Sequence, residues 1–144
     1  MAEVVVDSNV IFGFRMQRDQ WHDRALDIVH AMDNNDLPQG QITNYALPEI
    51  LNPIQRRAGD DHAIKTLEFL ETSRGFRIRP LSREDLARGR TLFKGNSGVE
   101  LPDAVTVAYM RRTGIEYIYS FDDDFDRFEG VRRLTTAVDP FAPD

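Results

Sequence analysis

The sequence predicts a single α/β domain, spanning residues 1–144, with a mostly parallel central sheet. Short strand-like stretches alternate along the chain with amphipathic helical stretches, which is the pattern of repeated strand–helix units. The first strand contains Val4-Val5-Val6, an apolar run without a polar face, and such strands are covered by helices on both sides. No repeat, linker or low-complexity segment interrupts the pattern, and 144 residues suffice for one full core.

The composition excludes several classes of protein. With 41% hydrophobic and 29% charged residues, the chain is expected to fold rather than stay disordered. The absence of cysteine excludes disulfides, thiolate metal sites and thiol nucleophiles. No signal-peptide pattern and no apolar run of roughly 18–20 residues is present, so we expect a cytoplasmic location and no membrane contact.

The net charge of −6 argues against a broad basic surface for nucleic acid. A local basic surface stays open, because the cations are nearly all arginine and several occur as adjacent pairs. Arginine suits bidentate phosphate contacts, although each pair could equally lie on a solvated helix end. The pairs are Arg56-Arg57, Arg111-Arg112 and Arg132-Arg133.

In the first half of the chain, apolar spacing and turn residues set the expected elements. Trp21, Ala25 and Ile28 begin a helical spacing that continues to about residue 33. Pro53 is expected to kink or divide the next long helix, and Asp60 is placed to cap the one after it. The expected elements are a strand at 3–6, helices at 8–14 and 20–33, a strand at 41–43, and helices at 45–57 and 60–73.

In the second half, helix caps and strand alternation predict the rest. Phe76–Arg79 alternates as a half-buried strand near a sheet edge. Ser82 and Asp85 form a capping-box pattern, and Gly114 is a stop signal for a later helix that begins near Pro102. The expected elements are a strand at 76–79, a helix at 82–93, a loop at 95–98, a helix at 102–112, a strand at 116–121 and a last strand around 131–134.

Four acids fall where this architecture brings distant segments together. Asp7 ends the first strand, Asp122 follows the strand at 116–121, Asp103 lies early in its helix, and Glu49 borders an apolar helical face. Ligands of parallel α/β sheets bind at the carboxyl ends of the strands. Converging carboxylates repel one another, and a hard divalent cation such as Mg²⁺ or Mn²⁺ relieves that repulsion. We therefore expect a metal site that serves phosphodiester cleavage.

Each acid also has an ordinary structural alternative. Asp7 could be a helix cap, Asp103 could complement a helix dipole, and most acids of the run at 122–126 must be solvated. The hypothesis of a metal site therefore rests on the set of four rather than on any single member.

Taken in order, the four acidic motifs resemble those of the PIN domain, and in particular the VapC-like ribonuclease toxins of toxin–antitoxin pairs. A hydrophobic strand that ends in Asp-Ser opens the family and is matched at 4–11, and Glu49 follows Thr43 as the second acid. The third acid lies in Leu101-Pro102-Asp103-Ala104-Val105, and the fourth in Ser120-Phe121-Asp122-Asp123-Asp124-Phe125. The resemblance covers nearly the whole chain.

The resemblance implies a three-layer α/β/α fold and a Mg²⁺-dependent endoribonuclease, with Mn²⁺ as a possible substitute. By position, Asp7 and Asp103 would be the principal metal ligands, and Glu49 and Asp122 would complete the acidic site. Ser8 would help to orient Asp7. The resemblance also implies an RNA substrate, a small antitoxin protein that blocks the site, and a homodimer.

The sequence departs from the family in its acid-rich run, where Asp124 or Asp126 could replace or assist Asp122. Three other functions stay open: a housekeeping RNA-processing PIN nuclease, a non-catalytic α/β binding module, and a phosphatase with an aspartate nucleophile. The phosphatase is disfavoured because Asn9 stands where that chemistry wants a second acid. The loop at 95–98 lacks the lysine of a phosphate-binding loop, and the three histidines form no ligand pattern.

Overall fold

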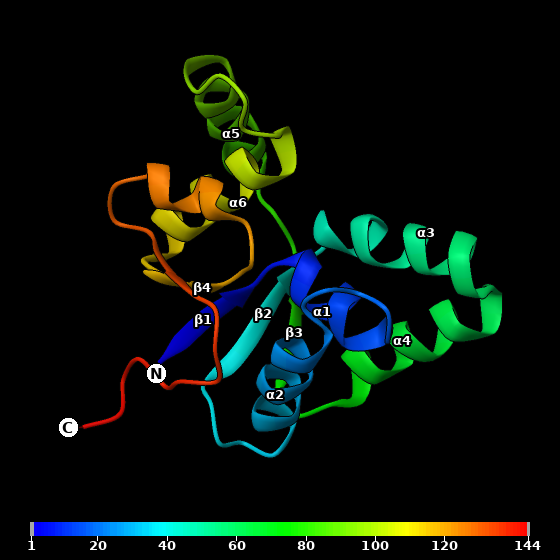
Figure 1. Ribbon diagram of the computed structural model, residues 1–144. Coiled ribbons are helices and arrows are strands. Elements are labelled where there is room, and N and C mark those ends of the chain that lie inside the picture. The colour runs from blue at the N-terminus through cyan, green and yellow to red at the C-terminus, as the bar shows by residue number, and fades with distance from the viewer. Residues whose placement is uncertain (1, 144) are drawn as a thin grey trace.

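The computed structural model describes residues 2–143, and it has a five-stranded sheet between two layers of helices (Figure 1). Strands and helices alternate as expected, and a short 3₁₀ helix, η1, follows β4. The elements are β1 (Glu3–Val6), α1 (Ser8–Arg15), α2 (His22–Asp33), β2 (Gln39–Thr43), α3 (Ala46–Ala58), α4 (Asp60–Thr72), β3 (Phe76–Arg79), α5 (Arg83–Gly95), α6 (Leu101–Thr113), β4 (Tyr117–Tyr119), η1 (Asp123–Arg127) and β5 (Arg132–Leu134).

The sheet is entirely parallel, with the strand order β3-β2-β1-β4-β5. β1 lies at its centre, with Val4 opposite Gly40 of β2 and Val5 opposite Ile118 of β4. The chain builds outwards from β1 to β3 on one side, and then returns to place β4 and β5 on the other. This reversal creates a topological switch point between β1 and β4, where parallel α/β sheets bind ligands.

Alternate valines of β1 supply two separate cores, as a strand covered on both faces requires. Val4 and Val6 lie in the larger core, with buried residues of α1, α2, α3 and α4. Val5 lies in the other core, with α6, η1 and Phe128. The three layers expected from the resemblance are therefore confirmed.

Several local expectations were right. β3 is an edge strand, and Ser82 and Asp85 form a complete capping box at the start of α5. The buried Asp85 carboxylate also binds Arg112 of α6 through two hydrogen bonds of 2.6 and 3.0 Å. This interaction joins the first turn of α5 to the last turn of α6.

Other local expectations were wrong. Of the two outcomes expected for Pro53, division of the helix is ruled out, because α3 runs from Ala46 to Ala58 as one helix. Asp60 is the first residue of α4 rather than its cap, because Gly59 occupies the cap position at φ 95°, where glycine is favoured. α5 extends to Gly95, and β4 is shorter than the strand expected at 116–121.

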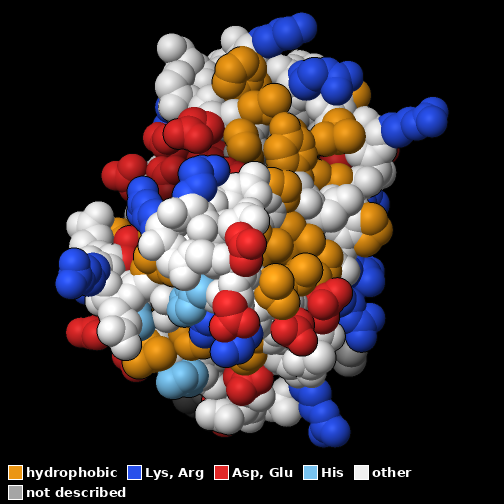
Figure 2. Space-filling model, turned by 90° about the vertical axis from the view of Figure 1, so that its right-hand side faces the viewer, with side chains coloured by type: hydrophobic (Ala, Val, Ile, Leu, Met, Phe, Trp, Pro, Cys, Tyr) orange, Lys and Arg blue, Asp and Glu red, His pale blue; other side chains and the backbone are white. Residues whose placement is uncertain are grey.

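Figure 2 shows one face of the molecule, on which a band of hydrophobic side chains runs down from the α5 end. Phe93 of α5 and Ile64 of α4 are among the large hydrophobic residues that stay exposed, at 45% and 56%. A dense group of acidic side chains lies beside the band, with basic side chains directly below it. Within residues 2–143, no helix has the length and apolar character needed to cross a membrane.

Candidate active site

The candidate site lies at the carboxyl ends of β1 and β4, which pair in parallel at the switch point. Asp7 directly follows β1, and Ser120 directly follows β4. The backbone N–H of Asp7 donates to the carbonyl of Tyr119 at 3.0 Å, so the ladder between the two strands continues up to Asp7. Residues from opposite ends of the sequence therefore meet here.

Asp7 is buried, with 8% of its surface exposed, and is held in one orientation. It is the N-cap residue of α1, and its Oδ1 accepts a hydrogen bond of 2.8 Å from the backbone N–H of Ser8. Its Oδ2 accepts one of 2.6 Å from the hydroxyl of Ser120. Burial is the main cause that raises the pKa of Asp7 to about 6, while these hydrogen bonds oppose the rise.

The Ser120 hydroxyl connects Asp7 to the loop after β4. Its oxygen accepts a hydrogen bond from the backbone N–H of Asp122 at 3.0 Å and another from the Asn9 amide at 3.3 Å. The Asn9 carbonyl oxygen accepts from the backbone N–H of Phe121 at 3.2 Å. Asn9 and Ser120 therefore fix the start of α1 against the loop that carries Asp122.

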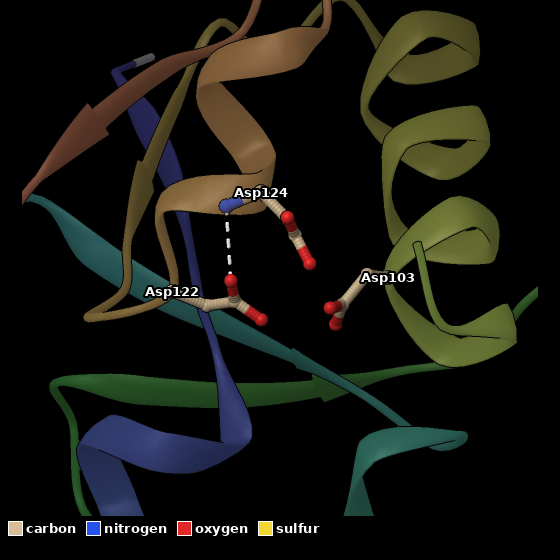
Figure 3. A group of neighbouring side chains, drawn as sticks. All are labelled: Asp103, Asp122 and Asp124. Carbon is tan, nitrogen blue, oxygen red and sulfur yellow. Dashed lines mark hydrogen bonds between the residues drawn. The ribbon is translucent and has the colours of Figure 1, made fainter. Parts of the chain in front are cut away.

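Asp103, Asp122 and Asp124 point toward one another across the site (Figure 3). One carboxylate oxygen from each lies within 4.8 Å of the others. Asp103 comes from the first turn of α6, and Asp124 from η1, where its backbone N–H donates to Oδ1 of Asp122 at 2.9 Å. The geometry therefore brings Asp103 and Asp122 together as the sequence predicts, and adds Asp124 to them.

The proximity of these acids changes the pKa of Asp103. Burial, followed by the negative charges of Asp7 and Asp122, raises the pKa of Asp103 to about 9. Asp7 therefore interacts electrostatically with Asp103. It is not, however, one of the three acids whose oxygens lie within 4.8 Å of one another.

Glu49, in the first turn of α3, faces the same acids. Burial raises its pKa to about 7, with contributions from the charges of Asp7 and Glu100. Glu100, the N-cap residue of α6, is an acid that sequence reasoning missed. Its position two residues before Pro102, at the start of the helix that carries Asp103, was the available signal.

The alternatives left open for the acid-rich run can now be separated. Asp126 forms two hydrogen bonds of 3.1 and 3.0 Å with Arg133, which holds the pKa of Asp126 below its usual range. Of the two, Asp124 is therefore the acid that lies with Asp103 and Asp122. Ser8 donates a hydrogen bond to Asp7 from its backbone N–H. The buried hydroxyl that donates to the other oxygen of Asp7 belongs to Ser120.

The donor set fits a hard divalent cation. All the side-chain donors are carboxylate oxygens, and three of the acids have pKa values raised by burial and mutual repulsion. Among the described residues, none of Asp7, Glu49, Asp103 and Asp122 forms an ion pair with a lysine or arginine, and Arg127 lies 3.9 Å from Asp124. A divalent ion would neutralise charges that the chain itself leaves uncompensated.

Comparison with solved structures shows the same fold in several toxins. The toxin VapC20 of Mycobacterium tuberculosis, described as cleaving the sarcin–ricin loop, is 21% identical with a TM-score of 0.75, over 95% of this chain and 99% of that one. VapBC2 of Rickettsia felis, solved with a promoter DNA fragment, is 11% identical with a TM-score of 0.68, over 92% and 97%. DNA-bound VapBC of Salmonella typhimurium is 12% identical with a TM-score of 0.68, over 93% and 98%.

Identities this low establish a shared fold and nothing more. No curated protein matches the sequence. The model of the PIN domain family matches residues 4–131, which include all four acids predicted from the sequence together with Ser120 and Asp124. The chain therefore belongs to the PIN domain family.

Proposed function

We propose that this chain is a metal-dependent endoribonuclease, and that it is the toxin of a type II toxin–antitoxin pair. The observation that carries the proposal is the convergence of Asp7, Glu49, Asp103 and Asp122, from four separate elements, on one end of the sheet. Membership in the PIN family, a family of nucleases, supports hydrolysis of phosphodiester bonds. The same convergence argues against a non-catalytic module, because mutual repulsion of the acids destabilises the fold.

We infer that Asp7, Asp103 and Asp122 hold Mg²⁺ or Mn²⁺ together with Asp124, one oxygen of which lies within 4.8 Å of oxygens of Asp103 and Asp122, and that Glu49 lies at the margin of the site. When bound, such an ion supplies charge neutralisation for a phosphodiester and lowers the pKa of its water. A donor set made only of carboxylate oxygens is the kind that these two ions prefer.

The chain's own residues prepare the site before substrate arrives. The Ser120 hydroxyl donates a hydrogen bond to Oδ2 of Asp7, which favours the ionised form of that carboxylate and fixes its orientation. Asn9 fixes the backbone that carries Asp122, so the two acids keep a constant separation. Glu49, whose pKa burial raises to about 7 in the metal-free chain, adds a further carboxylate from α3 to the site.

The proposed partners are an RNA strand, a small antitoxin protein and a second copy of the chain. The solved structures of similar fold include the VapBC complexes and the gonococcal FitAcB, and VapC20 is described as a toxin that cleaves the sarcin–ricin loop. The exposed hydrophobic band of Figure 2 offers a surface for association. An RNA substrate also suits the cytoplasmic location expected from the sequence. We propose further that residues 1–144 act as one domain.

Cleavage of a labelled single-stranded RNA by the purified chain tests the nuclease. We expect cleavage with Mg²⁺ or Mn²⁺, none with EDTA, and a loss of roughly 100-fold or more in Asp103→Asn. Asp123→Asn is the matched control, because Asp123 is an exposed acid of the same run and lies outside the group of three. Absence of cleavage with either metal, or equal loss in both variants, contradicts the proposal.

The toxin role is separated from a housekeeping role by growth. A toxin arrests growth when the chain is expressed alone, and co-expression of a small protein encoded beside it restores growth. A housekeeping nuclease leaves growth unaffected, and no neighbouring small reading frame changes the outcome.

A further inference from the structure

A groove lined by arginines runs between the end of α1, the loop after it and the ends of α3 and α4. It consists of two hollows of about 430 and 600 Å³ that share Met16 and Arg18. Phe12 and Arg57 line the first hollow, and Arg15 lines the second. The two hollows are neighbours, because Met16 and Arg18 line both, and together they are called the arginine groove here.

The charge of this groove is opposite to that of the chain as a whole, which is −6. Arg15, Arg18 and Arg57 form no ion pair with a carboxylate among the described residues, whereas six other cations do. Asp19 also lines the groove, and its Oδ2 accepts a hydrogen bond from the backbone N–H of Trp21. The three arginines therefore present uncompensated positive charge.

Arg15 keeps its charge although it is partly enclosed. Its Nε donates to the hydroxyl of Thr66 at 2.8 Å, and its Nη2 lies 3.2 Å from Nδ1 of His62. Both partners are without negative charge, so these contacts orient the guanidinium without neutralising it. Arg18 and Arg57 are exposed.

The groove begins close to the acidic site, because the same two helices supply both. Asp7 caps α1, and Phe12 follows five residues later, about 7.5 Å along the helix. Glu49 lies in the first turn of α3, and Arg57 follows eight residues later, about 12 Å along that helix. The Arg57 guanidinium lies over the Phe12 ring at 5.3 Å, which ties the two helices together beyond the acids.

We propose that this groove binds the phosphates of the RNA strand on one side of the bond that is cut, an inference that rests on the proposed function. The acids at the site repel a polyanion, so affinity for RNA must come from cations outside it. The arginine groove is placed to supply that affinity, because Arg15 follows Asp7 and Arg57 follows Glu49 by eight residues each, slightly over two helical turns. An acidic protein segment is the alternative occupant, but it has no need to lie beside the acids.

The test measures binding of a fluorescein-labelled single-stranded oligoribonucleotide by anisotropy, with the full chain in EDTA, so that no cleavage occurs. We expect Arg18→Gln and Arg57→Gln each to weaken binding several-fold, and the double variant to flatten the salt dependence between about 50 and 200 mM. Each lost phosphate contact is expected to reduce the slope of log K against log salt by about 0.7. Arg90→Gln, an exposed arginine of α5 outside the groove, is the matched control and is expected to bind as the unaltered chain does.

An unchanged affinity and slope in the double variant overturn the inference. Poly-glutamate serves as the probe for an acidic protein segment. If the double variant keeps its RNA affinity but no longer binds poly-glutamate, the inference is also overturned, because the groove would then serve a protein partner. Both results leave the nuclease proposal intact, since cleavage in Mg²⁺ is measured separately on the unaltered chain. Failure of that cleavage is the result that counts against the nuclease itself.

Discussion

The hydroxyl of Ser120 donates a hydrogen bond of 2.6 Å to Asp7, across a separation of 113 positions in the sequence. Ser120 is fully buried, and its oxygen also accepts from the backbone N–H of Asp122. Replacing Ser120 with alanine removes the donor to Asp7 and the acceptor for Asp122 together. We expect cleavage to fall by about 10–100-fold, as for other residues that orient metal ligands.

Stability should fall in the same variant, because a partly buried N–H loses its partner at a cost of about 1–3 kcal/mol. Ser120→Thr keeps the hydroxyl and should recover most of the activity, which separates positioning from packing. The measurements are cleavage rate and urea unfolding of both variants. Equal activity in Ser120→Ala and the unaltered chain would show that the hydroxyl has no part in orienting Asp7.

Much of the fold could be predicted because its signals are local. The apolar run at Val4–Val6 predicts a central strand, and the Ser82–Asp85 capping box predicts the start of α5 to the residue. The sequence suggested that Pro53 could divide the helix because a proline destabilises the turn around it. The buried Ile50 and Ile54 hold α3 together through tertiary packing, which outweighs this local destabilisation. Tertiary contacts of this kind leave no mark in the residues around the proline.

The acidic site could be predicted only in part. The sequence marks the element boundaries near which the four predicted acids stand, namely Asp7, Glu49, Asp103 and Asp122. In the structure the other three acids all contribute to the raised pKa of Asp103. Which of Asp124 and Asp126 joins them depends on the position of Arg133, fixed by β5. The part played by Asn9 in joining two loops depends likewise on strand pairing that no local pattern reports.

The metal-free chain should be more stable in mild acid than at alkaline pH. The pKa values of Asp7, Glu49 and Asp103 are raised in the folded state to about 6, 7 and 9, from 3.8, 4.5 and 3.8. The folded state therefore holds protons that the unfolded chain releases above about pH 4, so stability falls as pH rises through these values.

The carboxyls of Asp85 and Asp126 act in the opposite direction, since their arginine partners lower their pKa values. Their contribution is lost only as pH falls below about 4, so the metal-free chain is expected to be most stable at about pH 4, near the ordinary carboxyl pKa, and to lose stability as pH rises from there. Thermal unfolding in EDTA at pH 5 and pH 8 measures the effect, and Mg²⁺ should remove most of the difference. A higher Tm at pH 8 in EDTA would mean that the acids do not repel one another as placed.

Gly89 of α5 should not tolerate alanine. A Cβ at this position would lie 2.5 Å from Cγ2 and 2.7 Å from Cα of Val105 in α6, so the backbones would have to separate. We expect this overpacking, at about 1–3 kcal/mol, to exceed the gain of about 1 kcal/mol from replacing a helical glycine. Gly95→Ala is the control, because a Cβ there meets nothing within 4 Å, and its unfolding midpoint should stay the same or rise slightly.

Replacing Asp103 with asparagine should lower the cleavage activity and raise the thermal stability of the metal-free chain. Burial and the charges of Asp7 and Asp122 raise the pKa of Asp103 to about 9, so at pH 8 the metal-free chain must take up a proton there when it folds, and an uncharged side chain of the same shape avoids that cost. At pH 8 in EDTA we therefore expect Tm to rise by a few degrees, since a gain of roughly 1 kcal/mol shifts Tm by that amount in a domain of this size. The same variant should lose most of the stabilisation that Mg²⁺ gives the unaltered chain, because one ligand is gone. Asp123→Asn should show neither change, so a rise in both variants would point to the net charge of −6 rather than to the site.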